Sequence, residues 1–163
     1  MKNLYTITIF AENTPGVLYR IADLFLRRKI NIESLTVSEI EQENLSRFTI
    51  TVLADKDLVE KVTKQLYRII EVSKVIESTN EDLIYKELAF IKVFVKDGQR
   101  RGEIADLATM CRGKVVFVGG DFLVIEVVGT EEKINRLYRL LVPYGIKEFV
   151  RTGRISVFKE KKL

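Results

Sequence analysis

Hydrophobic and polar residues alternate over residues 4–10, which predicts a β-strand with one buried face. A period of three to four residues follows over residues 18–25, and this spacing predicts an amphipathic helix. Thr14 and Pro15 are typical of a helix start, because a threonine hydroxyl can cap the first turn and proline is tolerated there. We therefore expect the helix to begin at these two residues.

The pattern continues with two β-rich runs, residues 32–40 and 45–53, on either side of a polar turn. They predict a β-hairpin. A second amphipathic helix is expected over residues 57–70 and a fourth strand over residues 72–77. The order of elements in this half of the chain is β-α-β-β-α-β.

A polar break at residues 78–83 predicts a linker, after which the same order recurs. The sequence therefore predicts an α+β protein with two ferredoxin-like domains in tandem, residues 1–78 and 84–158. In each domain both helices would cover one face of a four-stranded antiparallel sheet. The other face is left open, and we expect it to pack on a second copy or a larger partner. The elements expected in the second domain are strands at residues 87–95, 114–118, 122–128 and 147–150, and helices at 101–111 and 131–142.

The composition is that of a folded chain, with 47% hydrophobic and 31% charged residues. No apolar run is long enough to span a bilayer, and no signal-peptide pattern is visible, so we expect a cytoplasmic protein without membrane contact. Residues 1–80 are neutral, and the whole net charge of +4 lies in residues 81–163. The basic run at residues 151–162 is expected to be a solvated, frayed tail rather than a nucleic-acid contact.

The chain has no histidine and a single cysteine, Cys111. This composition removes the usual members of zinc sites and of histidine-based catalytic triads. No phosphate-binding loop or dinucleotide fingerprint is present. Cys111 falls in an apolar helical register and is expected to be a packing residue. We therefore predict neither a catalytic residue nor a metal site in this chain.

The loop before the first helix is the candidate binding site. Its backbone N–H groups would point out of a helix N-terminus, which favours a carboxylate. Gly16 would let a ligand approach the backbone, and the Asn13 side chain can both donate and accept hydrogen bonds. On spacing alone these residues favour an ordinary helix cap, and Asn31 an ordinary turn, while the binding interpretation stays open.

Two segments resemble the ACT domain of acetolactate synthase small subunits. They are Asn13-Thr14-Pro15-Gly16-Val17-Leu18 and Asn31-Ile32-Glu33-Ser34-Leu35-Thr36-Val37. The second domain also contains Arg112-Gly113-Lys114-Val115-Val116 and Pro143-Tyr144-Gly145-Ile146, which are similar to the C-terminal half of that family. The resemblance therefore covers nearly the whole chain.

This resemblance implies a non-catalytic regulatory subunit that forms a homodimer through its ACT domains. It would activate a large catalytic subunit in branched-chain amino-acid synthesis and confer feedback inhibition by valine, with isoleucine and leucine as alternative effectors. This chain would hold no cofactor, whereas thiamine diphosphate, magnesium and FAD are expected in the large subunit. No nucleic-acid partner is implied. The effector-binding residues that the resemblance assigns are Asn13, Gly16, Val17, Leu18, Asn31 and Ile32.

The chemistry of these residues suggests their roles. The amides from Gly16 to Leu18 would bind the effector carboxylate, the Asn13 and Asn31 side chains its ammonium group, and Leu18 and Ile32 its side chain. One position departs from the family, which has glycine at or near Lys29. A left-handed backbone is unfavourable for lysine, by about 1 kcal/mol. The turn must therefore either bear that strain or adopt another geometry.

A different class of function remains as an alternative. Many RNA-binding proteins share the β-α-β-β-α-β order, sometimes in tandem and with excess positive charge. The segment from Gly113 to Val118 faintly resembles their basic and aromatic central strand. A tandem RNA-recognition protein is therefore the second hypothesis.

Overall fold

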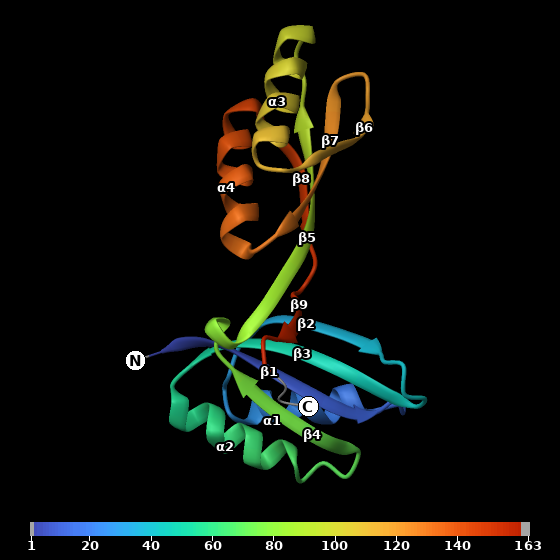
Figure 1. Ribbon diagram of the computed structural model, residues 1–163, viewed down its shortest axis with the longest axis vertical. Helices are drawn as coiled ribbons and strands as arrows, with labels where there is room; N and C mark the ends of the chain where they lie inside the picture. The colour runs from blue at the N-terminus through green and yellow to red at the C-terminus, as the bar shows by residue number, and fades with distance from the viewer. Residues whose placement is uncertain (1, 161–163) are drawn as a thin grey trace. The chain divides into compact units, whose positions relative to one another are not determined.

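The computed structural model describes residues 2–160. It divides the chain into two compact units. One contains the residues through Ile84 together with those from Arg154 onward, and the other is Tyr85–Gly153. Each unit has the β-α-β-β-α-β order, which confirms the predicted α+β class and the tandem repeat (Figure 1).

The first unit is a four-stranded antiparallel sheet in the order β2-β3-β1-β4. Its helices cover one face, where Ile7, Ile50 and Val62 are fully buried in the core (Figure 1). Because side chains alternate along a strand, Thr6 and Thr8 lie on the opposite face. The elements are β1 (Asn3–Glu12), α1 (Val17–Arg27), β2 (Ile32–Glu39), β3 (Leu45–Ala54), α2 (Lys56–Leu66) and β4 (Val72–Ser78).

In the first unit, two helix boundaries differ by more than one residue from the prediction. Helix α1 begins at Val17 and not at Thr14, and no side chain caps it, because Gly16 occupies the N-cap in a left-handed conformation. The predicted Thr14 cap was therefore wrong. Helix α2 ends at Leu66 instead of residue 70, because the chain continues in tight turns in which the Ile69 N–H donates to the Leu66 carbonyl.

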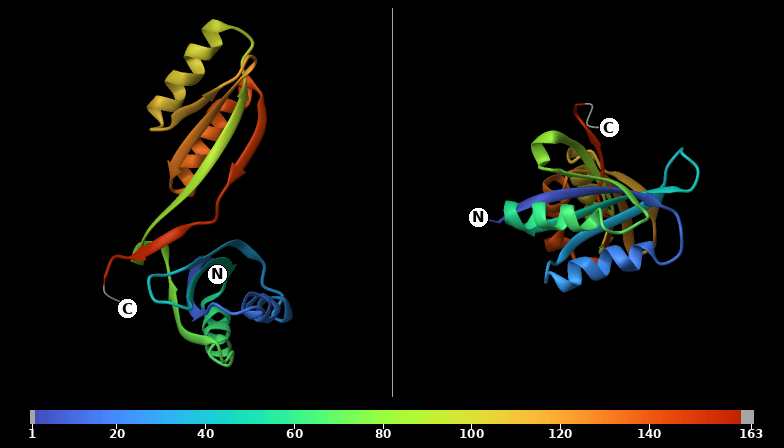
Figure 2. Two further views of the ribbon diagram at one scale, coloured as in Figure 1. Left: turned by 90° about the vertical axis from the view of Figure 1, so that its right-hand side faces the viewer. Right: turned by 90° about the horizontal axis from the view of Figure 1, so that it is seen from below.

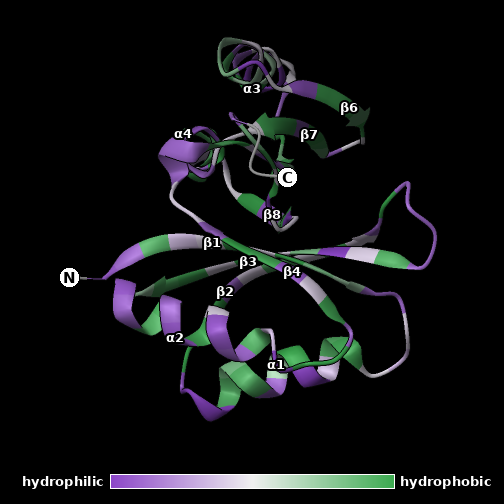
Figure 3. Ribbon diagram, turned by 60° about the horizontal axis from the view of Figure 1, so that its bottom comes forward, coloured by the Kyte–Doolittle hydropathy of each residue, from purple (hydrophilic) through white to green (hydrophobic). Residues whose placement is uncertain are grey.

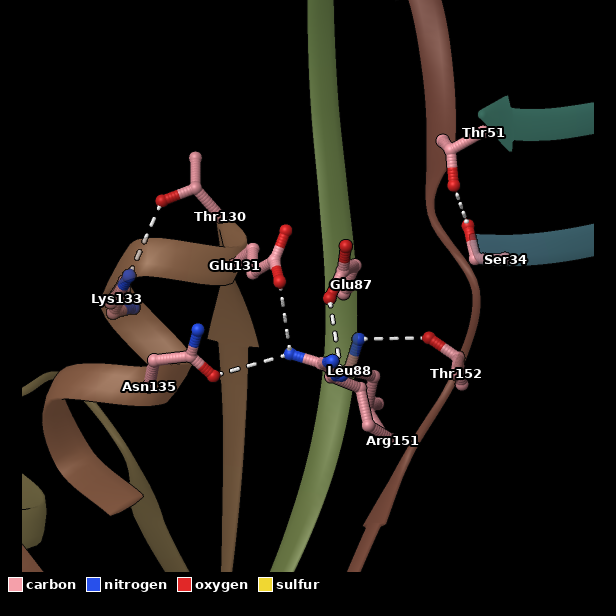
Figure 4. A network of polar contacts seen from close by, with 10 residues as sticks. All are labelled: Ser34, Thr51, Glu87, Leu88, Thr130, Glu131, Lys133, Asn135, Arg151 and Thr152. Atoms are coloured by element: carbon pink, nitrogen blue, oxygen red, sulfur yellow. Dashed lines mark hydrogen bonds and ion pairs between the residues drawn. The ribbon is translucent and has the colours of Figure 1, made fainter. Parts of the chain in front are cut away.

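The second unit repeats the topology, with strand order β6-β7-β5-β8. Asp97 and Thr130 cap its two helices, each accepting a hydrogen bond from a backbone N–H three residues later. Arg151 ties the last strand to helix α4 through Asn135 and Glu131, and to strand β5 through Glu87 (Figure 4). The elements are the 3-10 turn η1 (Asn80–Asp82) that precedes the unit, then β5 (Leu83–Phe94), α3 (Gly98–Met110), β6 (Lys114–Val118), β7 (Phe122–Gly129), α4 (Glu131–Leu141), η2 (Val142–Tyr144) and β8 (Ile146–Arg151).

A ninth strand, β9 (Ile155–Phe158), was not expected from the sequence. It pairs with β5 and is visible as the red strand beside the start of β5 in the left view of Figure 2. Arg154, only 2% exposed, donates hydrogen bonds to the Thr6 hydroxyl at 3.3 Å and to Asn80 Oδ1 at 2.8 Å. Arg47 donates to the Ser156 carbonyl at 2.6 Å, and burial lowers the pKa of its guanidinium group.

This C-terminal segment therefore covers part of the first sheet on the face opposite the helices, because Thr6 and Arg47 both lie on that face. The expected boundaries, residues 1–78 and 84–158, differ from the two units because the last strand returns to the first unit. The frayed-tail prediction was wrong for Arg151 and Arg154. Of the other members of that run, Lys159 is exposed and its backbone N–H donates to the Asp82 carbonyl, whereas Lys161 and Lys162 lie outside the described residues.

Within residues 2–160, none of the helices combines the length and apolar character needed to cross a membrane.

Candidate functional site

The predicted loop joins the end of β1 to the start of α1. The Asn13 N–H donates to the Asn44 carbonyl at 2.8 Å, which holds the loop against the β2–β3 turn. The side chains of Asn13 and Leu18 are exposed, and Gly16 is open to solvent. Val17 is different, because its side chain is buried in the core and its N–H donates to the Thr14 carbonyl at 3.4 Å.

Gly16 determines the geometry of this loop. Its φ of 90° lies in the left-handed region, which glycine adopts without steric cost. The helix that follows has first-turn N–H groups with no intrahelical acceptor, and these carry the positive end of the helix dipole. The loop therefore presents backbone donors and partial positive charge to solvent, an arrangement suited to a carboxylate.

The structure adds a charged residue that the sequence analysis missed. A Cβ atom on Gly16 would lie 3.4 Å from Arg20 Nη1, so the guanidinium group of Arg20 stands directly over this glycine. Arg20 also forms an ion pair with Glu71, which follows helix α2. The one-turn spacing from Gly16 to Arg20 could have suggested the first contact, since residues four apart share a helix face. The contact with Glu71 depends on tertiary packing.

The second predicted segment begins at the other end of α1. Asn31 is exposed, and its side-chain amide donates to the Glu33 carboxylate at 3.1 Å. Ile32 is half-buried against the core and pairs with Val52.

Lys29 precedes Asn31 with a φ of 55°. The turn thus bears the left-handed strain. The Ile30 N–H donates to the Phe25 carbonyl and the Lys29 N–H to the Leu26 carbonyl, which is a Schellman helix end. The same ending recurs in the second unit, where Arg112 has a φ of 55° and the Gly113 N–H donates to the Ala108 carbonyl.

One chain does not bring the two predicted segments together. Val52 pairs with Tyr5 on one side and with Ile32 on the other, so these three residues form one row across the sheet. Asn13 instead follows Glu12 at the far end of β1. Glu12 lies seven positions further along β1 than Tyr5, about 23 Å at the usual strand rise. This distance is more than one free amino acid can span. A pocket beside the loop shares only Thr14 with the segment from Asn13 to Leu18.

Comparison with known proteins identifies the family. The family model described as the AHAS small subunit-like ACT domain matches residues 7–74, and the model for the small subunit of acetolactate synthase matches residues 86–160. A probable acetolactate synthase small subunit of Archaeoglobus fulgidus is 45% identical over 158 residues, which cover 97% of this chain and 98% of that protein. The chain belongs to the acetolactate synthase small-subunit family.

Other relatives agree with this assignment. The acetolactate synthase small subunit of Mycolicibacterium smegmatis is 42% identical, over 94% of this chain and 89% of its own length. A crystal structure of the acetolactate synthase small subunit from Thermotoga maritima superimposes with a TM-score of 0.88 at 33% identity, covering 97% of this chain and 98% of that one. The first unit of this small subunit is thus an ACT domain, and membership of the family implies a large catalytic subunit as partner.

Proposed function

We propose that this small subunit is a homodimer that binds valine between two ACT domains, and that it activates the large subunit and makes it sensitive to valine. Isoleucine and leucine are weaker effectors in this proposal. The observation that carries it is the separation of the two predicted segments within one chain. A site built from both requires a second copy.

The exposed side of α1 supports such an association. Leu18, Tyr19 and Leu26 are 45%, 73% and 72% exposed, and Tyr19 and Leu26 share a helix face because they are seven residues apart. Two α1 helices packed antiparallel would bury these apolar side chains. They would also bring the Gly16 end of one copy to the Asn31 end of the other, which completes the site twice per dimer.

The loop chemistry indicates what the site would bind. The first-turn amides of α1 and the Arg20 guanidinium group would hold a carboxylate, while the Asn13 and Asn31 amide oxygens would accept from an ammonium group. The half-exposed side chain of Leu18 and the half-buried side chain of Ile32 would contact an aliphatic group. One methylene changes binding to an apolar pocket by about 1–3 kcal/mol, so valine would be preferred without excluding its neighbours.

Regulation would follow from linkage. The effector would shift the complex of small and large subunits toward a less active arrangement, because it binds that arrangement more tightly. The shift is limited by this difference in binding free energy, which is typically about 1–3 kcal/mol. Catalysis, with thiamine diphosphate, magnesium and FAD, would reside in the large subunit, and we place both in the cytoplasm.

Isothermal titration with valine tests the site directly. We expect saturable binding to the wild-type chain, no response to lysine, and loss of binding in Asn13→Ala. Asn3→Ala, which removes an exposed asparagine at the start of β1, is the matched control and should bind like wild type. Absence of binding to valine, isoleucine and leucine by the wild-type chain would refute the effector assignment.

Reconstitution with the large subunit tests the regulation. The wild-type chain should raise the activity, and valine should lower it again. Gly16→Ala places a side chain at a φ of 90° and against Arg20, so we expect it to abolish inhibition by valine while activation persists. A Gly16→Ala chain that no longer activates, although folded by circular dichroism, would contradict the division between effector loop and activating surface.

A further inference from the structure

The second unit has a hollow of about 430 Å³, lined by residues from the first part of β5, the end of α3 and the start of α4. Small-molecule sites have volumes of roughly 300–1,000 Å³. Figure 3 colours much of α4 as hydrophilic. The charged residues that line the hollow are Lys86 on β5, Arg112 after α3, and Glu132, Lys133 and Arg136 on α4.

The charge of this lining is strongly positive. Glu132 and Arg136 cancel in net charge, which leaves Lys86, Arg112 and Lys133 and a net charge of +3. Within residues 2–160, no ion pair involves any of these three cations. Like charges held close together repel one another and destabilise the fold. A bound anion would offset this repulsion.

Lys133 is held in place within the cluster. Its ammonium group donates to the Val128 carbonyl at 2.6 Å, and its chain lies so close to Gly129 that a Cβ atom there would overlap it. Burial, and after it the charges of Lys86 and Arg112, lower the pKa of the Lys133 ammonium group. An ammonium group has three N–H donors, so this lysine keeps donors for a ligand beside two further cations.

The chemistry of the hollow indicates a phosphate-bearing ligand. Guanidinium and ammonium groups both bind phosphate oxygens through charge-assisted hydrogen bonds. A carboxylate carries one negative charge and a phosphate group up to about two, so a net charge of +3 suits a ligand with more than one phosphate group. None of the described residues that line the hollow is aromatic, so it offers no platform for stacking a base.

We propose that this hollow binds a diphosphate group, held by Lys86, Arg112 and Lys133. The group is either inorganic diphosphate or the diphosphate of a nucleotide, since the same oxygens would contact the three cations in both. A nucleic acid would instead require a stripe of cations along one face, with aromatic side chains to stack its bases. The inference is independent of valine binding, because all three residues lie in the second unit.

Isothermal titration of the full chain with sodium diphosphate tests the site, without divalent cations and against sodium chloride of equal ionic strength. We expect saturable binding of one diphosphate per chain. Lys86→Met and Arg112→Gly should each weaken it about tenfold, because each removes a charge-assisted contact. Lys96→Met, at an exposed lysine beyond the other end of β5, is the matched control and should bind like wild type.

Arg112→Gly also separates loss of the ligand from loss of the fold. Arg112 has a φ of 55°, so glycine relieves backbone strain there, and the melting temperature should not fall. Absence of saturable binding by the wild-type chain would overturn the proposal. Equal affinities in wild type, Lys86→Met and Arg112→Gly would overturn it as well.

Cys111 provides a second readout, because it lines the hollow, is partly exposed and is the only cysteine of the chain. Iodoacetamide is uncharged, so the cations do not attract it. Diphosphate should slow alkylation of Cys111 in the wild-type chain and leave the rate unchanged in Arg112→Gly. An unchanged rate in the wild-type chain would refute the proposal.

A comparison of ligands identifies the source of the diphosphate group. Tighter binding of ADP than of diphosphate would assign the site to a nucleotide, and equal affinities would assign it to the diphosphate group alone. Tighter binding of an oligouridine RNA than of either, lost in Arg112→Gly, would overturn the proposal in favour of nucleic acid. Arg112→Gly should bind valine like wild type, which distinguishes failure of this site from failure of the effector site.

Discussion

The Arg154 guanidinium group donates a hydrogen bond to the hydroxyl of Thr6, 148 positions earlier in the chain. Arg154 also bonds Asn80 and is almost completely buried. It therefore fastens the C-terminal segment to the first strand of the ACT domain.

Arg154→Met should destabilise the first unit, because it removes the donor of the buried Thr6 hydroxyl and the hydrogen bond to Asn80. Hydrogen bonds to charged groups contribute about 1.5–3 kcal/mol each, so we expect a loss of about 2–4 kcal/mol in the free energy of unfolding, measured by urea denaturation. Arg68→Met, at an exposed arginine of the same unit, should change stability by less than about 0.5 kcal/mol. Equal effects of the two substitutions would show that the buried contacts are dispensable.

Lys29→Gly should stabilise the protein. Lys29 has a φ of 55° at the end of α1, where glycine has no steric cost, and the gain is partly offset by the greater flexibility of glycine in the unfolded chain. We expect a net increase of about 0.5–1 kcal/mol in the free energy of unfolding. Lys29→Ala keeps the Cβ and should bring no such gain. A glycine variant less stable than the alanine variant would contradict this account of the turn.

Arg20 and Glu71 should affect the affinity for valine in opposite directions. Arg20→Met removes a cation beside Gly16, and we expect about fivefold weaker binding, equivalent to about 1 kcal/mol. Glu71→Gln removes the carboxylate that pairs with Arg20 and should tighten binding, because a competing anion is lost.

Isothermal titration compares these two variants with Arg136→Met. Arg136 is an exposed arginine on α4 of the second unit and serves as the control. Weaker binding by all three variants would point to general damage to the fold rather than to a local charge effect.

Acid should remove the contribution of the ion pair between Asp121 and Lys147 to the stability of the fold. The hydrogen bond from Lys147 holds the pKa of the Asp121 carboxyl below its ordinary value. A lowered native pKa stabilises the fold above the unfolded-state pKa, which is about 4, and this stabilisation disappears as the pH falls through the native value.

Asp121→Asn should therefore lower the melting temperature at pH 7, and the difference from wild type should shrink below about pH 4. Lys147→Met should reproduce this pH dependence. A difference that stays constant down to pH 2 would argue against the pair as its source.

Local patterns in the sequence were sufficient for much of this architecture. Strand and helix periodicities place all eight predicted strands and four predicted helices, and the recurrence after the polar break predicts the tandem repeat. These features are recognisable because each depends on residues a few positions apart. For the turn at Lys29 the sequence left two outcomes, a strained left-handed backbone or another geometry, because a left-handed helix end depends on the residue at a single position. The structure shows the left-handed backbone.

The placement of the candidate site was harder to predict from the sequence. Asn13, Gly16 and Asn31 were singled out as residues, and the predicted helix already places Gly16 and Asn31 at its opposite ends. The distance between the two segments along the sheet follows from the register of three strands. The contact between Arg20 and Gly16 follows from one helical turn, whereas the ion pair with Glu71 joins two elements through packing.

The sequence by itself determined the order of the elements, their buried faces and the family, because hydrophobic periodicity and short motifs are local. Only the tertiary structure decided that the C-terminal segment returns to the first unit, with Arg154 buried against Thr6. It also decided that one open sheet face is partly covered while the other exposes phenylalanine side chains. The physical reason is that long-range pairing depends on the summed packing of residues far apart in the chain, which no local pattern records.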